Sequence, residues 1–168
     1  MKWIAISGSW RKSNSRLEQD VRKTVRGILN RGDGIVSGGA LGVDYFSTEE
    51  ALKFDPKAQQ IKVFIPASLK IYSDHYINRA KEGVITSRKA HQLIKQLKNL
   101  KAINPNALVA AINKTVDQDT YFERNSNIIN QADKLIAFWV NESPGVKNTI
   151  DKAVNKGIPV EIHEYTIK

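Results

Sequence analysis

Short apolar runs alternate with longer amphipathic segments along the whole chain. The runs are typical of buried strands and lead into turn residues; they cover 2–7, 35–36, 61–66, 134–140 and 157–162. Between them, apolar residues recur at spacings of three and four, as on one face of a helix, within 14–31, 41–54, 85–103, 122–131 and 146–155. Such alternation favours parallel βαβ units. We therefore expect an α/β fold: a Rossmann-like three-layer domain with a mostly parallel sheet and helices on both faces.

The middle of the chain has the weakest pattern. Pro66 ends the third predicted strand, and we expect a polar loop after it that passes through Ser68, Tyr72 and Asp74. Residues 107–112 are apolar, but the segment is too short for its periodicity to distinguish strand from helix. No motif can be placed between about residues 67 and 118.

Length and composition narrow the class of protein. A chain of 168 residues fits one domain, so we expect a single Rossmann-like unit over 1–168. The absence of cysteine excludes disulfides, thiolate metal sites and a cysteine nucleophile. The apolar run at the amino terminus is too short for a signal sequence or a membrane span. We therefore expect a cytoplasmic protein with no membrane partner.

The chain is strongly basic, with a formal charge of +9. Such a charge attracts nucleotides, nucleic acid or acidic lipid headgroups, but it also serves solubility alone. Much of it lies in the amphipathic segment 85–103, where basic residues are interspersed with apolar ones. That segment is interpreted either as a solvated outer face or as a nucleic-acid-binding face.

Small residues follow three of the predicted strands at the point where each ends. In an open parallel sheet the ligand crevice lies beyond the carboxyl ends of the strands, and small residues there let a phosphate approach free backbone N–H groups. One glycine turn of this kind equally predicts a simple tight turn, but three in order favour a ligand site. The candidate residues are Gly8, Ser9 and Arg11; Ser37, Gly38, Gly39, Gly42 and Asp44; and Gly145 and Thr149.

These turns carry a family resemblance. The segments concerned are Ser7-Gly8-Ser9, Ser37-Gly38-Gly39-Ala40-Leu41-Gly42-Val43-Asp44, and Arg124-Asn125-Ser126-Asn127-Ile128 before the apolar run 135–140. They resemble the SLOG superfamily of Rossmann-like proteins, most closely the Rossmann domain of the DNA-processing protein A family. The resemblance implies a pocket built from the glycine turns, with Arg124 and Asn125 near it, and a homodimer.

The residues themselves leave the roles of Arg124 and Asn125 open. The guanidinium of Arg124 could bind phosphate through its planar fork, or could pair with a carboxylate such as Glu123 or Asp133. The amide of Asn125 could orient a loop or contact the ligand.

A second branch of the superfamily is the phosphoribohydrolases, whose pattern PGGxGTxxE ends in a catalytic glutamate. Placed on residues 144–152, that pattern puts Lys152 where the glutamate belongs, and Asp151 lies one residue early. On a helix this displacement rotates a carboxylate by about 100°, which disfavours the same hydrolytic chemistry. The sequence contains no P-loop or HExxH motif, and its scattered histidines suggest no metal site, so neither a cofactor nor a metal is expected.

Three functional hypotheses follow. The first is binding of a nucleotide or a nucleotide-derived phosphorylated ligand, with the glycine turns around the phosphate, Arg11 and Arg124 supplying charge, and Asp44 accepting hydrogen bonds from ribose or base. The second is a nucleotide-cleaving hydrolase acting on an N-glycosidic or phosphate bond through Asp44, Asp151 or Glu142. The third is single-stranded DNA binding through the basic surface. Tyr72, Tyr76 and Tyr121 are either stacking residues for that strand or ordinary packing residues.

Overall fold

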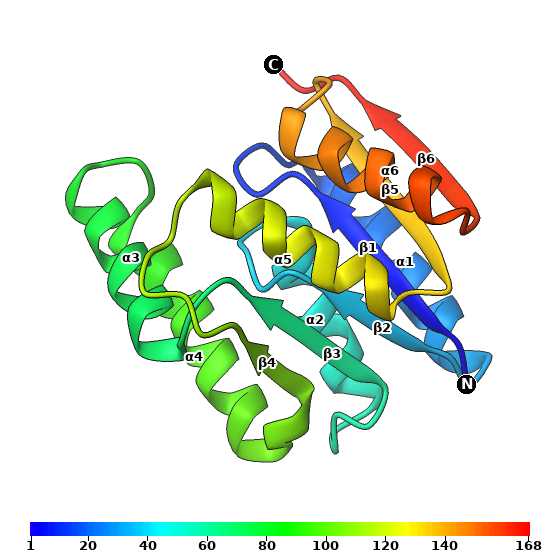
Figure 1. Cartoon of the computed structure of the whole chain (residues 1–168), viewed down its shortest axis with the longest axis horizontal. Coiled ribbons are helices and arrows are strands. Elements are labelled where there is room, and N and C mark those ends of the chain that lie inside the picture. Colours follow the sequence, from blue (N-terminus) through cyan, green and yellow to red (C-terminus); the bar gives the residue numbers. More distant parts are fainter.

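Six parallel strands form one sheet in the order β4-β3-β2-β1-β5-β6 (Figure 1). The computed structural model describes all 168 residues. The strands are β1 (Trp3–Gly8), β2 (Gly34–Ser37), β3 (Ile61–Ile65), β4 (Leu108–Ala110), β5 (Lys134–Val140) and β6 (Val160–Tyr165). The helices are α1 (Ser15–Asn30), α2 (Val43–Phe54), α3 (Leu69–Lys81), α4 (Ser87–Ile103), α5 (Gln118–Gln131) and α6 (Pro144–Lys156), with a short 3-10 turn at Pro105–Ala107. The predicted α/β Rossmann-like fold is confirmed.

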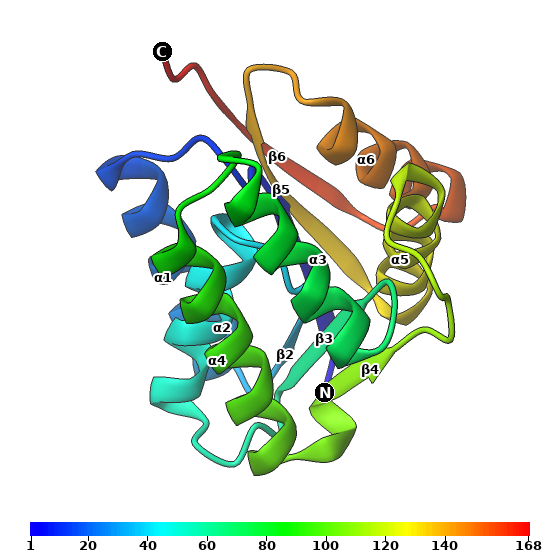
Figure 2. The same ribbon diagram turned by 90° about the vertical axis from the view of Figure 1, so that its left-hand side faces the viewer.

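The helices lie on both faces of the sheet (Figure 2). Helices α1 to α4 pack on one face, where their apolar residues meet strand residues such as Ile4 and Ile6. Helices α5 and α6 pack on the other face, to which Ala5, between those two isoleucines, contributes its side chain. Successive strand residues point to opposite faces, so one strand contributes to both layers of the core.

Helix α3 contradicts the polar loop that we expected after Pro66. The hydroxyl of Ser68 accepts a hydrogen bond from the Ile71 N–H at 3.2 Å and caps the helix. The buried side is formed largely by Tyr72 and Tyr76, one turn apart, which are 0% and 4% exposed. The Tyr72 hydroxyl donates to the Gly39 carbonyl oxygen at 3.0 Å. Tyrosines with partnered hydroxyls thus supply an apolar face that a simple hydrophobic pattern does not reveal.

Strand β4 resolves the segment whose type the sequence left open. It pairs in parallel with β3 through three residues, Leu108 to Ala110. Helix α5 also begins earlier than its apolar pattern indicated, because Asp117 and Thr120 form a capping box at its start.

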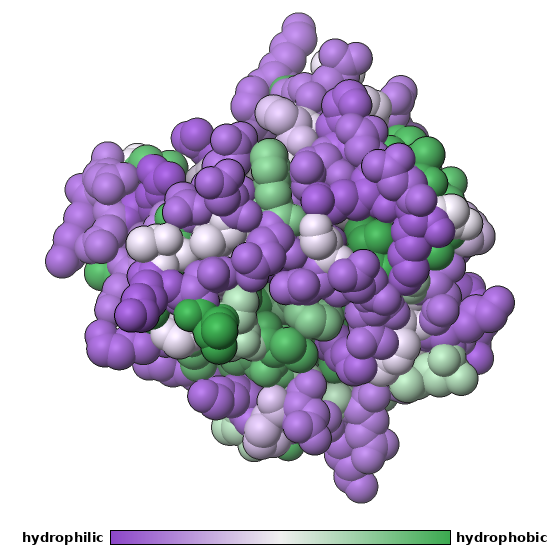
Figure 3. All heavy atoms as spheres, viewed as in Figure 1, coloured by the Kyte–Doolittle hydropathy of each residue, from purple (hydrophilic) through white to green (hydrophobic).

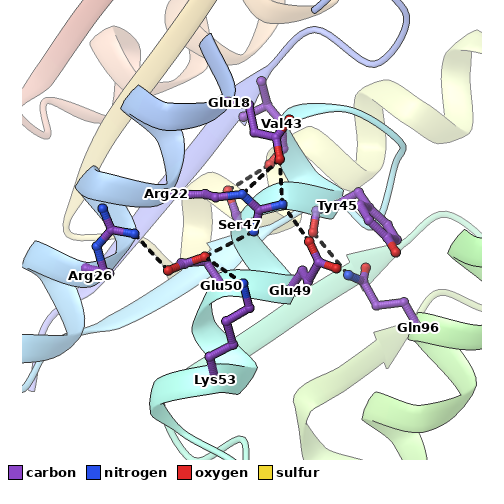
Figure 4. Close-up of polar contacts among 10 residues, drawn as sticks. All are labelled: Glu18, Arg22, Arg26, Val43, Tyr45, Ser47, Glu49, Glu50, Lys53 and Gln96. Carbon is purple, nitrogen blue, oxygen red and sulfur yellow. Dashed lines mark hydrogen bonds and ion pairs between the residues drawn. The ribbon is translucent and has the colours of Figure 1, made fainter. Parts of the chain in front are cut away.

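A network of charged side chains joins α1 to α2 (Figure 4). Arg22 pairs with Glu50 at 3.1 Å and with Glu18 at 2.8 Å, while Arg26 pairs with the second oxygen of Glu50 at 2.9 Å. The Glu50 side chain is only 5% exposed, and its charge is met by two guanidinium groups and by Lys53 at 3.4 Å. These contacts hold α2, and therefore the turn before it, against α1.

The outer part of the sheet is left partly uncovered beside α5. Figure 3 shows an apolar patch there, over β3 and β4, bordered by hydrophilic residues. A hollow of about 430 Å³ lies at this place, lined by residues that include Phe64, Val109 and Asn127.

The homodimer implied by the family resemblance stays a prediction. None of the helices is both long enough and apolar enough to span a bilayer.

Candidate functional site

The order of the strands reverses at β1. From β1 the chain moves outward through β2, β3 and β4, and it then returns to place β5 and β6 on the other side of β1. Where the connections after two neighbouring strands run in opposite directions, a crevice forms beyond the carboxyl ends of those strands. Ligands usually bind there in open α/β sheets. Here Gly8 at the end of β1 is in register with Phe138 of β5. The topology therefore places the expected ligand crevice between the β1–α1 loop and the β5–α6 turn.

The β1–α1 loop is held tightly against the turn after β2. The backbone N–H of Val43 donates to the Ser9 carbonyl oxygen at 3.0 Å, so this loop caps the start of α2. Gly42 has φ +71, and a Cβ there would overlap the Ser9 carbonyl oxygen. A Cβ on Gly8 would overlap the side chain of Val43. Both glycines are thus required by the close approach of two loops.

The β1–α1 loop is exposed from Trp10 onward, beginning with Trp10, Arg11 and Lys12. Trp10 is 39% exposed, and the Arg11 guanidinium carbon lies 5.3 Å from the centre of its ring. The Ser9 hydroxyl accepts a hydrogen bond from the Lys12 N–H at 3.0 Å, which gives the loop a defined turn. The loop therefore presents an aromatic ring and two cations on a fixed backbone.

Arg124 reaches from α5 to the turn after β2. It donates from Nη1 to the Gly38 carbonyl oxygen at 2.6 Å and from Nη2 to Asn125 Oδ1 at 3.2 Å. Its buried Nε has no partner. Of its two candidate carboxylate partners, Glu123 accepts instead from Asn113, and Asp133 from the Trp3 N–H. The ion-pair interpretation of Arg124 is therefore wrong, and its observed contacts hold the glycine turn.

Asp44 faces the interior of the same turn. Its carboxylate accepts a hydrogen bond from the Ala40 N–H at 3.2 Å, and the residue is 6% exposed. Burial raises the pKa of Asp44 to about 6, against the opposing effects of the Arg124 charge and of the Ala40 and Gly38 N–H groups. In this structure the carboxylate is directed at its own turn. A hydrogen bond from ribose or base to Asp44 stays a prediction.

Ser37 and Gly39 also lie on the inner side of this turn. Ser37 is fully buried, and its Oγ has no hydrogen-bond partner. Gly39 has φ +64, and a Cβ there would lie 2.8 Å from a methyl carbon of Ile65. Gly39 is therefore needed for packing against β3.

The turn after β5 opens onto the amino end of α6. Ser143 makes no side-chain capping bond there, and Gly145 is exposed, with room around the position of a Cβ. The first N–H groups of a helix have no intrahelical acceptor, so an uncapped start can receive an anion. Thr149 is buried one turn later, and its hydroxyl donates to the Gly145 carbonyl oxygen at 3.3 Å. Asn125 joins this helix to α5 by donating to Asn148 Oδ1 at 3.2 Å.

The candidate residues thus divide into two groups. Those that are exposed or partly exposed are Gly8, Ser9, Arg11, Gly42, Arg124 and Gly145. Those that are buried are Ser37, Gly38, Gly39, Asp44, Asn125 and Thr149. The sequence interpretation overlooked Trp10, although a large apolar side chain between serine and arginine after a strand was a usable signal.

The three tyrosines considered for base stacking are packing residues in this structure. Tyr72 and Tyr76 are buried with their ring centres 5.1 Å apart, and Tyr121 lies against His75 and Arg124. They support the β2–α2 turn from beneath, which is the packing interpretation.

Comparison with known proteins identifies the family. The model of the family described as DNA recombination-mediator protein A matches residues 1–168. The chain belongs to the DNA recombination-mediator protein A family. The resemblance seen in the sequence motifs is therefore confirmed. No curated protein matches the chain significantly.

Solved structures of this fold include two DNA processing protein A chains. The one from Helicobacter pylori, described for its single-stranded DNA binding mode, superposes with a TM-score of 0.69 at 21% identity, covering 96% of this chain. The one from Streptococcus pneumoniae gives 0.51 at 16% identity, covering 95%. This chain spans 64% and 58% of their respective lengths. A structural-genomics target, TM1055, gives 0.55 at 17% identity, with 95% of this chain and 72% of its own covered.

Proposed function

We propose that this chain binds single-stranded DNA at the crevice between the β1–α1 loop and the β5–α6 turn. The observation that carries the proposal is the exposed sequence Trp10-Arg11-Lys12 beside the glycine turns. Proteins that hold single strands combine cations for the backbone with aromatic rings for the bases. Membership of the DNA recombination-mediator protein A family and the fold shared with a DNA-binding protein from Helicobacter pylori support it.

Helix α4 offers a continuation of this surface. It carries five cations, makes no ion pair and contains no acidic residue: Arg88, Lys89, Lys95, Lys98 and Lys101. Its opposite side packs into the core through Leu93, Leu97 and Leu100. Unpaired cations along a helix face bind phosphates and release counterions in proportion to their number. In our proposal a strand held at the crevice continues along this face.

The first experiment measures fluorescence anisotropy of a labelled oligothymidylate of about 20 nucleotides at several salt concentrations. Wild type is expected to bind at low salt, with an affinity that falls steeply as salt is added. Arg11→Gln with Lys12→Gln is expected to weaken binding about tenfold or more and to flatten the salt dependence. The control is Lys2→Gln with Lys57→Gln, which removes two exposed cations from segments that precede β1 and β3, away from the carboxyl ends of the strands. Folded wild type that fails to bind at low salt would reject the proposal.

A second experiment separates α4 from the crevice. Neutralising Arg88, Lys95 and Lys98 to glutamine is expected to lower the slope of log affinity against log salt by about 2, at roughly 0.7 per lost phosphate contact on a single strand. Neutralising Lys2, Lys23 and Lys57 instead removes the same charge elsewhere. An equal effect of the two triple variants would show that only net charge matters.

A nucleotide or a nucleotide-derived phosphorylated ligand is the second candidate. Its support is the uncapped start of α6, where the exposed Gly145 leaves backbone N–H groups accessible. Calorimetry with nucleoside monophosphates is expected to give saturable binding that competes with the oligonucleotide and is lost in Gly145→Leu. Absence of heat and of competition would remove this candidate. We do not propose hydrolysis, because Asp44 is engaged by its own turn and Asp151 is paired with Lys147 at 2.9 Å.

A further inference from the structure

A cleft of about 300 Å³ lies beside the crevice, between the β1–α1 loop and the connection from α3 to α4. Both segments lie at the end of the molecule where the strands terminate (Figure 2). Its lining includes no acidic residue; it comprises Trp10, Arg11, Leu41, Gly83, Val84, Ile85, Thr86 and Lys89. The volume is at the lower limit of ligand pockets, which suits a single planar group better than a large molecule.

The walls and the rim of this cleft differ in chemistry. Trp10, Leu41 and the Val84–Ile85 pair supply apolar surface, whereas Arg11 and Lys89 supply positive charge from opposite sides. Trp10 stands 39% exposed, and Lys89 is exposed and makes no ion pair. The Arg11 guanidinium carbon lies 5.3 Å from the centre of the Trp10 ring, and Lys89 belongs to the same lining. A partly exposed indole with cations beside it is the combination that single-strand binders use for a base and its neighbouring phosphates.

The backbone around the cleft is well supported, so the cleft is a built feature. On one side Ser9, which directly precedes Trp10, accepts two hydrogen bonds: its carbonyl oxygen from the Val43 N–H and its hydroxyl from the Lys12 N–H. On the other side the Thr86 hydroxyl accepts from Lys89 N–H at 3.2 Å and caps α4. Trp10 and Lys89 are therefore presented from two anchored segments, and a ligand need not order either backbone.

We propose that this cleft is a base-binding subsite for single-stranded nucleic acid, in which one base stacks on the Trp10 indole and its flanking phosphates meet Arg11 and Lys89. This inference rests on the proposed function and extends it from the crevice to a defined neighbouring nucleotide position. Stacking on an indole accepts any base, so the subsite contributes affinity with little sequence preference. From this position the strand reaches α4 directly, because Lys89 lies in the first turn of that helix.

Tryptophan emission gives a direct test, because Trp10 is the exposed member of the three tryptophans and Trp3 and Trp139 are half-buried. Titration with oligothymidylate is expected to quench wild-type emission in parallel with the anisotropy signal. Trp10→Phe is expected to abolish most of the quenching while keeping most of the affinity, since phenylalanine still stacks. Trp10→Ala is expected to lower the affinity about tenfold or more. Trp3→Phe is the control. It should leave the quenching of Trp10 emission and the affinity of the protein for oligothymidylate unchanged.

Lys89→Gln is expected to weaken binding several-fold and to lower the salt slope by about 0.7 without changing the quenching at saturation. Circular dichroism melting checks that each variant is folded. If oligothymidylate binds but Trp10→Ala binds as tightly as wild type and no emission is quenched, the subsite is wrong and the proposed function stands. If folded wild type binds no oligonucleotide at low salt, the proposed function and the subsite both fall.

Discussion

Arg124 donates from Nη1 to the carbonyl oxygen of Gly38 at 2.6 Å, across 86 residues of sequence. The contact ties α5 to the glycine turn after β2. A Cβ at position 38 would lie 2.7 Å from the guanidinium carbon, so a side chain there and this arginine conformation exclude each other. Glycine at 38 and arginine at 124 therefore act as a pair.

Gly38→Ala tests this pairing. The backbone of Gly38 has no positive φ, so alanine is tolerated by the main chain and acts only by displacing the guanidinium. We expect a loss of about 1.5–3 kcal/mol in the free energy of unfolding, which is typical of a hydrogen bond that involves a charged group. In an Arg124→Ala background the same change should cost almost nothing. Urea denaturation of the four proteins measures the coupling.

Gly27→Ala in the middle of α1 is the control for the glycine-to-alanine change itself, because a Cβ there meets nothing closer than 3.6 Å. It should stabilise the protein by about 0.5–1 kcal/mol. Additive losses for Gly38→Ala and Arg124→Ala would contradict the pairing.

Gly42→Ala should be far more damaging. The residue combines φ +71 with a Cβ position that overlaps the Ser9 carbonyl oxygen, and a backbone atom cannot swing aside as a side chain can. We expect a loss of about 3 kcal/mol or more, or a displaced β1–α1 loop with weakened oligonucleotide binding. Gly83→Ala is the matched control, since it has φ +79 but no neighbour within 4 Å. It should cost only about 1–2 kcal/mol of backbone strain, and equal losses for the two variants would refute the steric explanation.

Asp44 makes stability depend on pH. Burial raises its pKa in the folded protein to about 6, above the unfolded value of 3.8, so the folded state binds this proton more tightly. Ionisation of Asp44 therefore lowers the free energy of unfolding. This loss is absent below about pH 4, grows between about pH 4 and 6, and reaches about 3 kcal/mol above that range, since the folded and unfolded pKa values differ by about two. Asp44→Asn cannot ionise, so its stability relative to wild type should rise with pH across this window.

Chemical denaturation at several pH values measures that difference. Asp151→Asn, which removes an exposed carboxylate, is the control. Parallel pH profiles for Asp44→Asn and wild type would show that the burial of Asp44 has no energetic consequence. Arg124→Ala should steepen the wild-type profile, because its positive charge lowers the pKa of Asp44.

Glu50→Gln should weaken the attachment of α2 to α1. The carboxylate is nearly buried and serves Arg22 and Arg26 together, so its loss leaves the partly buried Arg22 with fewer partners. We expect a loss of about 3 kcal/mol, as for a broken buried ion pair. Burial alone would raise the pKa of Glu50, but hydrogen bonds from Arg26 and Arg22 outweigh it and bring the pKa below its usual value. This stabilisation is therefore present at neutral pH and disappears as the pH falls through the lowered pKa.

Asp74→Asn is the matched control for that variant. It breaks the Lys70–Asp74 pair, whose side chains are 84% and 56% exposed. Exposed pairs contribute about 0–1 kcal/mol, so thermal and urea unfolding should change little. A loss comparable to that of Glu50→Gln would contradict the importance of burial.

The sequence by itself determined the parallel α/β architecture and the position of the glycine turns at the strand ends. Both depend on local properties: the alternation of apolar runs with helical periodicity, and the need for glycine where the backbone turns sharply. The family motifs around Gly38 and Arg124 added the expectation that these distant segments meet, and the hydrogen bond between them bears it out.

Only the tertiary structure decided which way the candidate residues face. Asp44 and Gly39 belong to a ligand-type motif, yet their neighbours bury them, because burial depends on elements far away in sequence such as β3 and α3. Helix α3 itself was hidden by tyrosines whose hydroxyls find partners only in the fold. The cleft beside Trp10 likewise exists because the α3–α4 connection folds back to the β1–α1 loop, and no local pattern encodes a contact between such separated segments.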